Sequence, residues 1–240
     1  MLKGLAAMSP LSDLALLRPD FSIEKSLYSQ GYRIIAGIDE AGRGALAGPL
    51  SVGMVIYPVS IYTETPLSVT GSIADSKKLS SKKRSEALSV IRSHSLSFTS
   101  AFVSHAVIDS SNINIATEKG IIKLLARSEI KPDVIIMDGN FKFQFDIPFI
   151  SVIKGDNRSI SIASASIVAK VSRDELMDKL HLKYPDYGFS RNKGYGTRDH
   201  IACLADKGFS YVHRKSYEPV RSLVDNLTES RRLLFDEDNR

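Results

Sequence analysis

Residues 34 to 44 read Ile34-Ile35-Ala36-Gly37-Ile38-Asp39-Glu40-Ala41-Gly42-Arg43-Gly44, an apolar run that leads into two adjacent carboxylates and a Gly-Arg-Gly turn. The apolar run predicts a buried strand that ends at the two acids. Carboxylates at a strand end are well placed to hold a divalent metal ion, because hard cations prefer oxygen ligands. The glycines beside Arg43 let the backbone approach an anion while the guanidinium binds it. The segment therefore predicts chemistry on a phosphodiester.

Strand-like and helix-like segments alternate along most of the 240 residues, which predicts an α/β fold. The expected strands cover residues 34–38, 50–57, 98–107, 134–137 and 149–153. The expected helices cover residues 81–93 with Ser81 as N-cap, 113–127 and 159–182, while residues 58–74 are expected to form a loop. We expect a catalytic core over residues 31–183 and an N-terminal extension over 1–30 that packs outside this core. Residues 184–240 are expected to form a helical subdomain, with short helices from 197 to 226 and then a charged tail.

The composition of the chain restricts its class only loosely. A formal net charge of +5 fits a polyanionic partner, although many soluble enzymes are equally basic. The single cysteine, Cys203, excludes an internal disulfide and a cysteine-built metal site, which favours a reducing cytoplasm. No apolar run reaches the roughly 18 residues that a membrane-spanning helix needs, and residues 1–17 do not form a convincing signal peptide. We expect a cytoplasmic monomer that does not bind membranes.

Two further acids follow apolar runs in the same way as Asp39 and Glu40. Asp138 follows residues 134–137, and Asp156 follows the run that ends at residue 153. Because α/β active sites lie at the carboxyl ends of strands, these four carboxylates are expected to come together. Such a cluster repels itself unless cations neutralise it, and two Mg²⁺ or Mn²⁺ ions about 4 Å apart would suit its oxygen ligands.

The alternative is that each acid caps a helix or pairs with a nearby base. There is also a geometrical condition, because adjacent strand residues point to opposite faces of a sheet. Asp39 and Glu40 can share a site only if the backbone turns there, which the following glycines permit. Asp174 and Glu175, beside Arg173 well along an expected helix, are assigned to a structural salt bridge instead.

Two other segments carry candidate substrate contacts. Lys77 and Lys78 precede an expected helix N-terminus, which is a natural phosphate seat, although a plain helix cap with solvated lysines is at least as well supported. Tyr195 lies between two glycines in a loop rich in aromatic and basic residues. Such a loop suits stacking on sugars or bases, and the alternative is a loop held by buried aromatic rings. Neither a P-loop nor a dinucleotide-binding glycine pattern is present.

From about residue 33 to 221 the chain closely resembles ribonuclease HII, the prokaryotic type 2 ribonuclease H. The resemblance rests on segments in a specific order and spacing: Asp-Glu-Ala-Gly-Arg-Gly with Ala47-Gly48-Pro49, Asp75-Ser76-Lys77-Lys78-Leu79, Met137-Asp138-Gly139, Lys154-Gly155-Asp156, the run from Ala165 to Asp174, Asn192-Lys193-Gly194-Tyr195-Gly196-Thr197 and His213-Arg214-Lys215-Ser216. Tyr217 stands where the family usually has Phe. The intact Gly-Arg-Gly favours this family over the related ribonuclease HIII.

The resemblance implies a ribonuclease H-like mixed sheet flanked by helices, with a C-terminal helical subdomain. It also implies roles for particular residues. The metal-binding catalytic acids would be Asp39, Glu40, Asp138 and Asp156. Residues Gly42, Arg43 and Gly44 would read the ribose 2′-OH and a neighbouring phosphate, and Tyr195 would pack on the sugar at the RNA-to-DNA junction.

The expected activity is endonucleolytic cleavage of the RNA strand of RNA–DNA hybrids and of single ribonucleotides embedded in duplex DNA. In the two-metal mechanism, with Mn²⁺ or Mg²⁺, water attacks the phosphate on the 5′ side of a ribonucleotide and leaves a 3′-hydroxyl and a 5′-phosphate. A contact with a replication clamp is left open. One alternative is a non-catalytic protein that binds RNA–DNA hybrids, and another is a different two-metal nuclease on the same scaffold, such as a resolvase-like enzyme.

Overall fold

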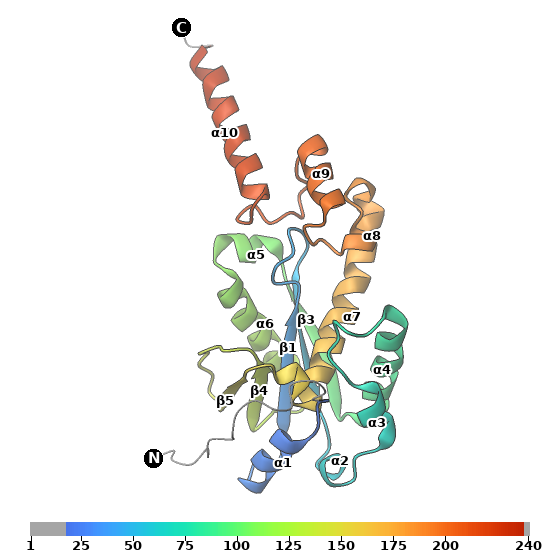
Figure 1. Ribbon diagram of the computed structural model, residues 1–240. Coiled ribbons are helices and arrows are strands. Elements are labelled where there is room, and N and C mark those ends of the chain that lie inside the picture. Colours follow the sequence, from blue (N-terminus) through green and yellow to red (C-terminus); the bar gives the residue numbers. More distant parts are fainter. Residues whose placement is uncertain (1–17, 238–240) are drawn as a thin grey trace, which may run out of the picture.

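A five-stranded mixed sheet forms the centre of the computed structural model, which describes residues 18–237 (Figure 1). Its strands are β1 (Ile35–Ala41), β2 (Leu50–Ile56), β3 (Ser97–Val103), β4 (Val134–Asp138) and β5 (Phe149–Val152), in the spatial order β3-β2-β1-β4-β5. Strands β1, β2 and β3 are antiparallel neighbours, whereas β1, β4 and β5 run parallel. All five expected strands are confirmed, with small differences at their ends.

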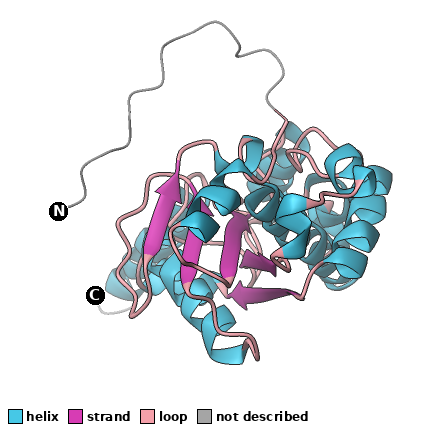
Figure 2. Cartoon of the chain, turned by 90° about the horizontal axis from the view of Figure 1, so that it is seen from below, coloured by secondary structure: helices cyan, strands magenta, loops and turns pink. Residues whose placement is uncertain are grey.

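Helices cover both faces of this sheet, as the view along it shows (Figure 2). On one face α7 (Ile160–Lys183) and α4 (Ser81–His94) pack against alternate residues of the strands, including Ile35 and Val55. On the other face α5 (His105–Ser110) and α6 (Ile113–Arg127) pack against the intervening residues, including Ile38 and Met54. The period-two pattern of each strand therefore divides its apolar side chains between two cores.

Two glycines bring α7 unusually close to the sheet. A Cβ atom added at Gly37 in β1 would lie 2.3 Å from the backbone carbon of Ser161. One added at Gly53 in β2 would lie 2.3 Å from the carbonyl oxygen of Ala165. Only glycine fits at these two positions, so the backbone of α7 packs directly on β1 and β2. The strand end that carries Asp39 is consequently held against this helix.

A C-terminal group of helices packs at one end of the sheet and has its own small core (Figure 1). It contains the 3₁₀ turn η2 (Pro185–Tyr187), α8 (Phe189–Asn192), α9 (Arg198–Lys207) and α10 (Val220–Glu237). Phe189, Leu204 and Val220 are buried there together with Leu46 and Ala47 from the loop after β1. Helix α10 continues to Glu237, so the charged tail expected after residue 226 is helical instead. Across the described residues, every helix is too short or too polar to cross a membrane.

Several sequence-based boundaries are wrong. The strand expected over 98–107 ends at Val103, because Ser104 caps α5 by accepting a hydrogen bond from the Val107 N–H. The loop expected over 58–74 contains two short helices, α2 (Ser60–Thr63) and α3 (Leu67–Ser72). The N-cap of α4 is Ser80 rather than Ser81, since its hydroxyl accepts the N–H of Lys83 at 3.3 Å.

The described part of the N-terminal extension belongs to the core, so the expectation that residues 1–30 pack outside it is wrong from residue 18 onward. Helix α1 (Ser22–Ser29) contributes Leu27, and Phe21 precedes it; both side chains are buried in the α7 core. Glu24 is fully buried and caps α7, because its carboxylate accepts the hydroxyl of Ser159 at 2.6 Å and the N–H of Ser161 at 3.0 Å. Residues 1–17 lie outside the described part of the chain.

Candidate active site

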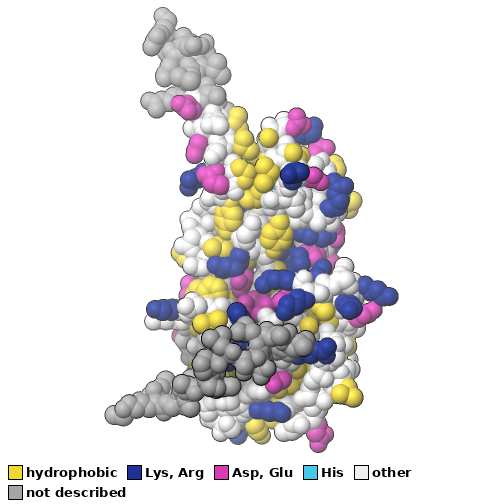
Figure 3. All heavy atoms as spheres, viewed as in Figure 1, with side chains coloured by type: hydrophobic (Ala, Val, Ile, Leu, Met, Phe, Trp, Pro, Cys, Tyr) yellow, Lys and Arg dark blue, Asp and Glu magenta, His cyan; other side chains and the backbone are white. Residues whose placement is uncertain are grey.

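Acidic side chains gather where the three parallel strands end. Strand β1 pairs with β4 so that Ile38 lies beside Met137, and Asp39 and Asp138 are the next residues along. Strand β4 pairs with β5 through Asp138 and Val152. The carboxyl ends of these strands therefore lie along one edge, as expected. Figure 3 shows acidic side chains at the centre of this face with lysine and arginine side chains around them.

Asp138 also determines where the fourth acid lies. Its Oδ1 atom accepts a hydrogen bond of 2.6 Å from the N–H of Gly155, which begins the 3₁₀ turn η1 (Gly155–Asn157). Lys154 adopts a left-handed conformation, with φ of 55°, at the start of this turn. The bend places Asp156 in a buried position, where its Oδ1 accepts from the side-chain amide of Asn157 at 2.7 Å.

Asp39 and Glu40 come together without the backbone turn that the sequence analysis required. Both remain in strand β1, where they pair with Gly53 and Val52 of β2. The turn begins only at Gly42. Asp39 accepts the N–H of Glu40 on its Oδ1 at 2.7 Å, which draws the Asp39 carboxylate toward its neighbour. The two carboxylates thus interact at the strand end although the strand remains extended.

Mutual repulsion is visible in the pKa values of three of these acids. Burial raises the pKa of Asp39 well above its ordinary value, and the charges of Glu40 and Asp138 add to this effect. Burial raises the pKa of Glu40 to about 7; Arg43 opposes the shift and Asp138 strengthens it. Burial also raises the pKa of Asp138, and repulsion from Asp156 adds to it. These carboxylates form one electrostatic cluster.

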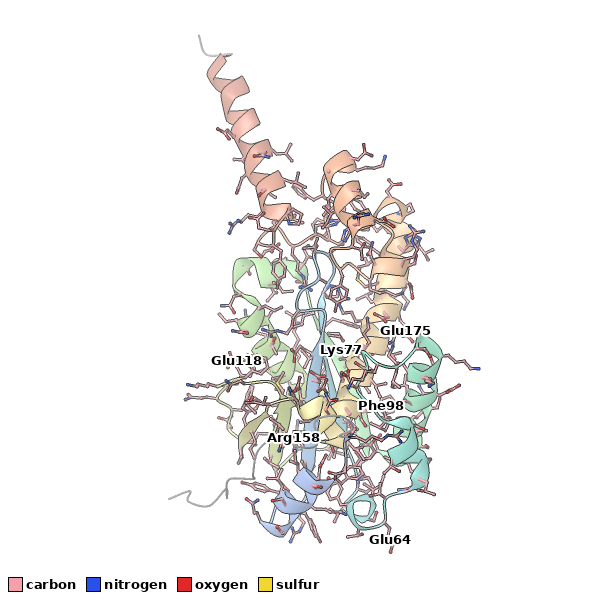
Figure 4. The ribbon with its side chains drawn as sticks, in the orientation of Figure 1. Glu64, Lys77, Phe98, Glu118, Arg158 and Glu175 are labelled. Atoms are coloured by element: carbon pink, nitrogen blue, oxygen red, sulfur yellow. The ribbon has the colours of Figure 1, made fainter. Side chains whose placement is uncertain are left out.

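One lysine supplies positive charge to this cluster. The Nζ atom of Lys77 lies 3.9 Å from Oδ2 of Asp156, and Figure 4 shows this side chain over the middle of β1, beside α7. Burial lowers the pKa of Lys77, but the surrounding carboxylates, including Asp39 and Asp138, outweigh burial and raise it. Lys78 instead contacts Asp75 at 3.8 Å and donates to Asn157 at 3.2 Å. The two neighbouring lysines therefore have different surroundings.

The donor set fits hard divalent cations, although the described side chains form no ready-made group of three metal ligands. All four candidates are carboxylates, and Oε2 of Glu40 is buried with no hydrogen-bond partner among the described residues. A buried carboxylate oxygen without a partner is costly unless a cation or a proton compensates it. The cluster is thus incomplete as it stands and has the chemistry that a magnesium or manganese ion requires.

The Gly-Arg-Gly loop lies beside the acids. Arg43 donates from Nη1 to Thr117 at 2.9 Å and from Nη2 to Asn114 at 2.8 Å, both on α6. Its Nε atom is 3.6 Å from Oε1 of Glu40, and its guanidinium lies over the ring of Phe141 at 5.2 Å. The N–H groups of Arg43 and Gly44 have no hydrogen-bond partner within the described chain. The loop therefore keeps free backbone donors next to a fixed arginine.

Two buried arginines hold this loop from behind. The sequence analysis gave Arg214 no role and placed Arg173 only beside an expected salt bridge. Arg214 donates to the carbonyl oxygen of Gly48 from Nε and Nη2, both at 3.1 Å, and to that of Arg43 from Nη1 at 2.8 Å. Arg173 donates to the carbonyl oxygens of Pro49, Ala47 and Lys193 at 3.0, 3.1 and 2.8 Å.

Both of these guanidinium groups are fully buried, and within residues 18–229 no carboxylate lies within ion-pair distance of either. Burial lowers the pKa of Arg214 to about 10, which leaves it charged at neutral pH. The available signals were the position of Arg173, which stands at helical spacing between Ala169 and Met177, and the arginine of the His-Arg-Lys-Ser segment. A buried cation in such places must find backbone or acidic partners.

The ring of Tyr195 packs against one of these buried arginines, Arg173. Its ring is 36% exposed and lies 5.3 Å from the guanidinium carbon of Arg173 and 5.7 Å from Nζ of Lys170. The residues around it in the loop, such as Tyr187 and Phe189, are buried against each other. Buried rings therefore hold this loop, and Tyr195 stays accessible within it.

Within the described residues, the structural salt bridge assigned to Asp174 and Glu175 is formed by Asp174 alone. It pairs with Lys170 at 2.7 Å and with Arg84 of α4 at 3.5 Å. Arg173, the neighbour in sequence, takes no part in this pair. Glu175 is exposed on α7 and is labelled in Figure 4.

Comparison of the sequence with known proteins gives a consistent result. The family model described as ribonuclease HII matches residues 36–220. Ribonuclease HII of Rickettsia typhi is 45% identical over 193 residues, which cover 80% of this chain and 95% of that protein. Ribonuclease HII of Syntrophus aciditrophicus is 43% identical over 195 residues, with 81% and 89% covered. That of Acholeplasma laidlawii is 43% identical over 206 residues, with 85% and 97% covered.

Solved structures share the same fold. Ribonuclease H2 from Pyrococcus horikoshii superposes with a TM-score of 0.67 at 24% identity, covering 80% of this chain and 98% of that one. The ribonuclease HII in the complex with PCNA from Archaeoglobus fulgidus gives 0.63 at 25% identity, with 77% and 95% covered. Bst-RNase HIII, solved in complex with Mn²⁺, gives 0.59 at 15% identity, with 82% and 71% covered.

Proposed function

Because this chain belongs to the ribonuclease HII family, it is an endonuclease for the RNA strand of RNA–DNA hybrids, and we propose that its strand-edge acids form the catalytic centre. The acids are Asp39, Glu40, Asp138 and Asp156. Enzymes of this family use divalent metal ions. We assign two Mg²⁺ or Mn²⁺ ions to these four carboxylates.

The observation that carries this proposal is the electrostatic state of the cluster. Burial and mutual repulsion raise the pKa values of Asp39, Glu40 and Asp138, and one oxygen of Glu40 is buried without a hydrogen-bond partner in the described part of the chain. A protein that only bound nucleic acid would gain nothing from concentrating negative charge beside a phosphate. Bound at this edge, two divalent ions supply an activated water and stabilise the leaving oxygen of the phosphodiester. The carboxylates hold that charge in place, and Lys77 offsets part of it.

The Gly-Arg-Gly loop and Tyr195 would provide specificity for ribose. The N–H groups of Arg43 and Gly44, which have no partner among residues 18–237, can donate to a phosphate oxygen or to the 2′-OH, and Arg43 is already oriented by Thr117 and Asn114. The exposed face of Tyr195 can pack on the sugar at the RNA-to-DNA junction. Since the 2′-OH alone separates RNA from DNA at one position, losing its hydrogen bond would leave site groups unpaired and penalise an all-DNA strand.

The two lysines before α4 complete the proposed substrate contacts. The side chains of Lys77 and Lys78 are 76% and 70% exposed, so both ammonium groups are accessible to a phosphate. A phosphate that approaches Lys77 would also lie near the acid cluster and its metal ions. We therefore assign Lys77 to a phosphate near the cleaved bond and Lys78 to one further along the strand.

The test is cleavage of a short DNA duplex that carries one ribonucleotide, with Mg²⁺ or Mn²⁺, beside an all-DNA duplex of the same sequence. We expect a single cut on the 5′ side of the ribonucleotide, with a 3′-hydroxyl and a 5′-phosphate, and no cut in the control. Binding without cleavage in either metal would support a non-catalytic hybrid-binding protein. Equal cleavage of both duplexes would point to a nuclease of another specificity.

Partners and location are proposals of the same kind. The Archaeoglobus fulgidus relative was solved as a complex with PCNA, so contact with a sliding clamp is a reasonable expectation for this chain. We propose that the protein acts as a monomer in the cytoplasm on hybrids and on ribonucleotide-containing duplex DNA. Light scattering at micromolar concentration, with and without the clamp of the source organism, checks the clamp contact and the monomeric state. A dimeric mass for the protein alone would refute the monomer. A mass that does not change when the clamp is added would refute the clamp contact.

A further inference from the structure

Two fully buried histidines touch each other between the C-terminal helices. The Nε2 atoms of His200, on α9, and His213, in the loop before α10, are 3.0 Å apart. Their rings lie 5.2 Å apart and are surrounded by the rings of Tyr187 and Phe189. Neither histidine belongs to the acid cluster, and the proposed cleavage does not use them.

The hydrogen bonds around the pair determine where each proton lies. The backbone N–H of Ser210 donates to Nδ1 of His213 at 2.9 Å, and the Ser210 hydroxyl lies 2.8 Å from the same atom, so this nitrogen carries no proton. A neutral His213 must then carry its proton on Nε2 and donate it to Nε2 of His200. His200 in turn carries its proton on Nδ1, which lies 2.9 Å from the carbonyl oxygen of Tyr195. That oxygen can only accept a hydrogen bond. The contact of His213 with Ser210 and the contact of His200 with Tyr195 therefore both require that His213 donates to His200.

Both histidines are held neutral by their surroundings. Burial lowers the pKa of His213 to about 4, and the neighbouring His200 and His105 contribute to this shift. Burial also lowers the pKa of His200. A proton added to His200 would place two donors against each other at the Nε2 contact, and a proton added to His213 would oppose the N–H of Ser210 at Nδ1. The directed chain therefore persists through the neutral pH range.

This series of hydrogen bonds ends at the backbone of Tyr195. Gly194 and Gly196 flank this residue, and Gly194 has a φ of 82°, so the segment has little intrinsic stiffness. The Tyr195 carbonyl is fixed by two donors, the N–H of Thr197 at 2.8 Å and Nδ1 of His200. Once the backbone is fixed, the ring rests on Arg173, which is itself held by three carbonyl oxygens.

We propose that His200 and His213 are positioning residues for Tyr195, and that their directed hydrogen bonds hold its ring at the orientation needed to recognise a ribose. This inference rests on the proposed function, because it assigns the histidines to the same ribose contact. Neither imidazole touches the substrate. Their effect is on the rate at the ribonucleotide, since a misplaced ring would leave binding of the nucleic acid strand by the loop and lysines intact.

Two substitutions of His200 separate positioning from packing. The side-chain amide of Asn matches Nδ1 of histidine, so His200→Asn keeps a donor for the Tyr195 carbonyl and loses the contact with His213. The amide of Gln reaches the Nε2 position, so His200→Gln keeps an acceptor for His213 and loses the donor to Tyr195. We expect His200→Gln to lower kcat on the single-ribonucleotide duplex about tenfold, with KM within about twofold of wild type.

The matched variant is expected to behave in the opposite way. His200→Asn should keep kcat within about threefold of wild type while its Tm falls more than that of His200→Gln, because it leaves the Nε2–H of His213 without a partner. Loss of activity that follows Tm across both variants would show a packing role only and overturn the proposal. An unchanged kcat in a folded His200→Gln variant would overturn it as well.

The proton positions can be measured without any activity. A long-range ¹H–¹⁵N correlation spectrum of the wild-type protein at pH 7.5 is expected to show His213 protonated on Nε2 and His200 protonated on Nδ1. The reverse pattern, or a charged ring, would refute the directed chain. A wild-type protein that cuts no ribonucleotide-containing duplex would instead refute the proposed function, whatever the spectrum shows, so the two failures are distinguishable.

Discussion

The acid cluster and the loop beside it are built on opposite principles. At the strand edge, carboxylates from β1, β4 and η1 repel one another, and Oε2 of Glu40 has no partner among the described residues. In the Gly-Arg-Gly loop, the carbonyl oxygens of Arg43, Ala47, Gly48 and Pro49 are each satisfied by the buried guanidinium of Arg173 or Arg214. One region is electrostatically incomplete, and the other is completed by the chain itself.

This difference fits the separate tasks that we propose for the two regions. A site that must hold exchangeable cations cannot neutralise its own charge. The repulsion among its carboxylates therefore destabilises the folded protein as long as no metal is bound. A site that must discriminate between ribose and deoxyribose needs donors held in one place before the substrate arrives. The buried arginines supply that rigidity, and the N–H groups of Arg43 and Gly44 keep no partner within the part of the chain that the structure describes.

The largest expected effect comes from removing a charge at the incomplete edge. Asp138→Asn should lower single-turnover cleavage by about 1000-fold at saturating metal, because Asp138 holds η1 as well as sharing the cation charge. Binding of an RNA–DNA hybrid, measured by fluorescence anisotropy, should change by less than about threefold. Glu175→Gln, which changes an exposed acid on α7, is the control and should cleave at the wild-type rate. Substantial turnover by Asp138→Asn would remove Asp138 from the site.

The next effect tests the completed loop. Arg214→Lys keeps the charge but loses the planar fork that reaches Gly48 and Arg43, so we expect the free energy of unfolding to fall by about 3 kcal/mol. Urea titration measures this loss. The control is Arg221→Lys, which alters an exposed ion pair with Glu218. Its free energy of unfolding should fall by less than about 0.5 kcal/mol. Equal stability of the two variants would mean that the Arg214 contacts do not hold the loop.

The histidine pair gives the support region a pH dependence. The folded pKa of His213, about 4, lies below its value of 6.5 in an unfolded chain, so the unfolded state takes up the proton first as pH falls. Stability from this residue is present above pH 6.5 and is lost as pH falls toward 4, by about 3 kcal/mol. Urea midpoints at pH 7 and pH 4.5 should therefore differ less in His213→Gln than in wild type. A parallel loss in both proteins would show that His200 and His105 carry the dependence instead.

The smallest effect has the opposite sign. The folded pKa of Glu40, about 7, lies above its ordinary value of 4.5, so its ionisation weakens the folded metal-free protein as pH rises through this interval. Glu40→Gln should therefore stabilise the protein in EDTA by about 2 kcal/mol at pH 8 and by much less at pH 5. Adding Mn²⁺ should reverse the order, because the wild type, with all four carboxylates, gains more stability from the cation than the variant does. Destabilisation by Glu40→Gln in EDTA at pH 8 would contradict the incomplete cluster.

The sequence was sufficient to select the acids as candidates because each follows an apolar run. It could not show how Asp39 and Glu40 meet, since this depends on the hydrogen bond from the Glu40 N–H and on Asp138 in the adjacent strand. It also gave no role to Arg214, and it placed Arg173 only beside an expected salt bridge. Their partners are carbonyl oxygens between 20 and 171 positions away along the chain, and backbone oxygens leave no trace in a residue pattern.

What the sequence determined by itself was the five strands, the helices α4, α6 and α7, and the kind of chemistry. Alternating apolar runs define the strands through local periodicity, and carboxylates with glycines and an arginine define a site for cations and phosphate. Only the tertiary structure decided which groups are satisfied. Parallel pairing of β1, β4 and β5 brings the acids together, and the contact of Gly37 and Gly53 with α7 brings that helix, and Arg173 with it, against the strand end. Whether a carbonyl oxygen finds a hydrogen-bond donor, and how strongly two carboxylates repel each other, depends on distances between residues remote in sequence. Those distances exist only in the folded chain.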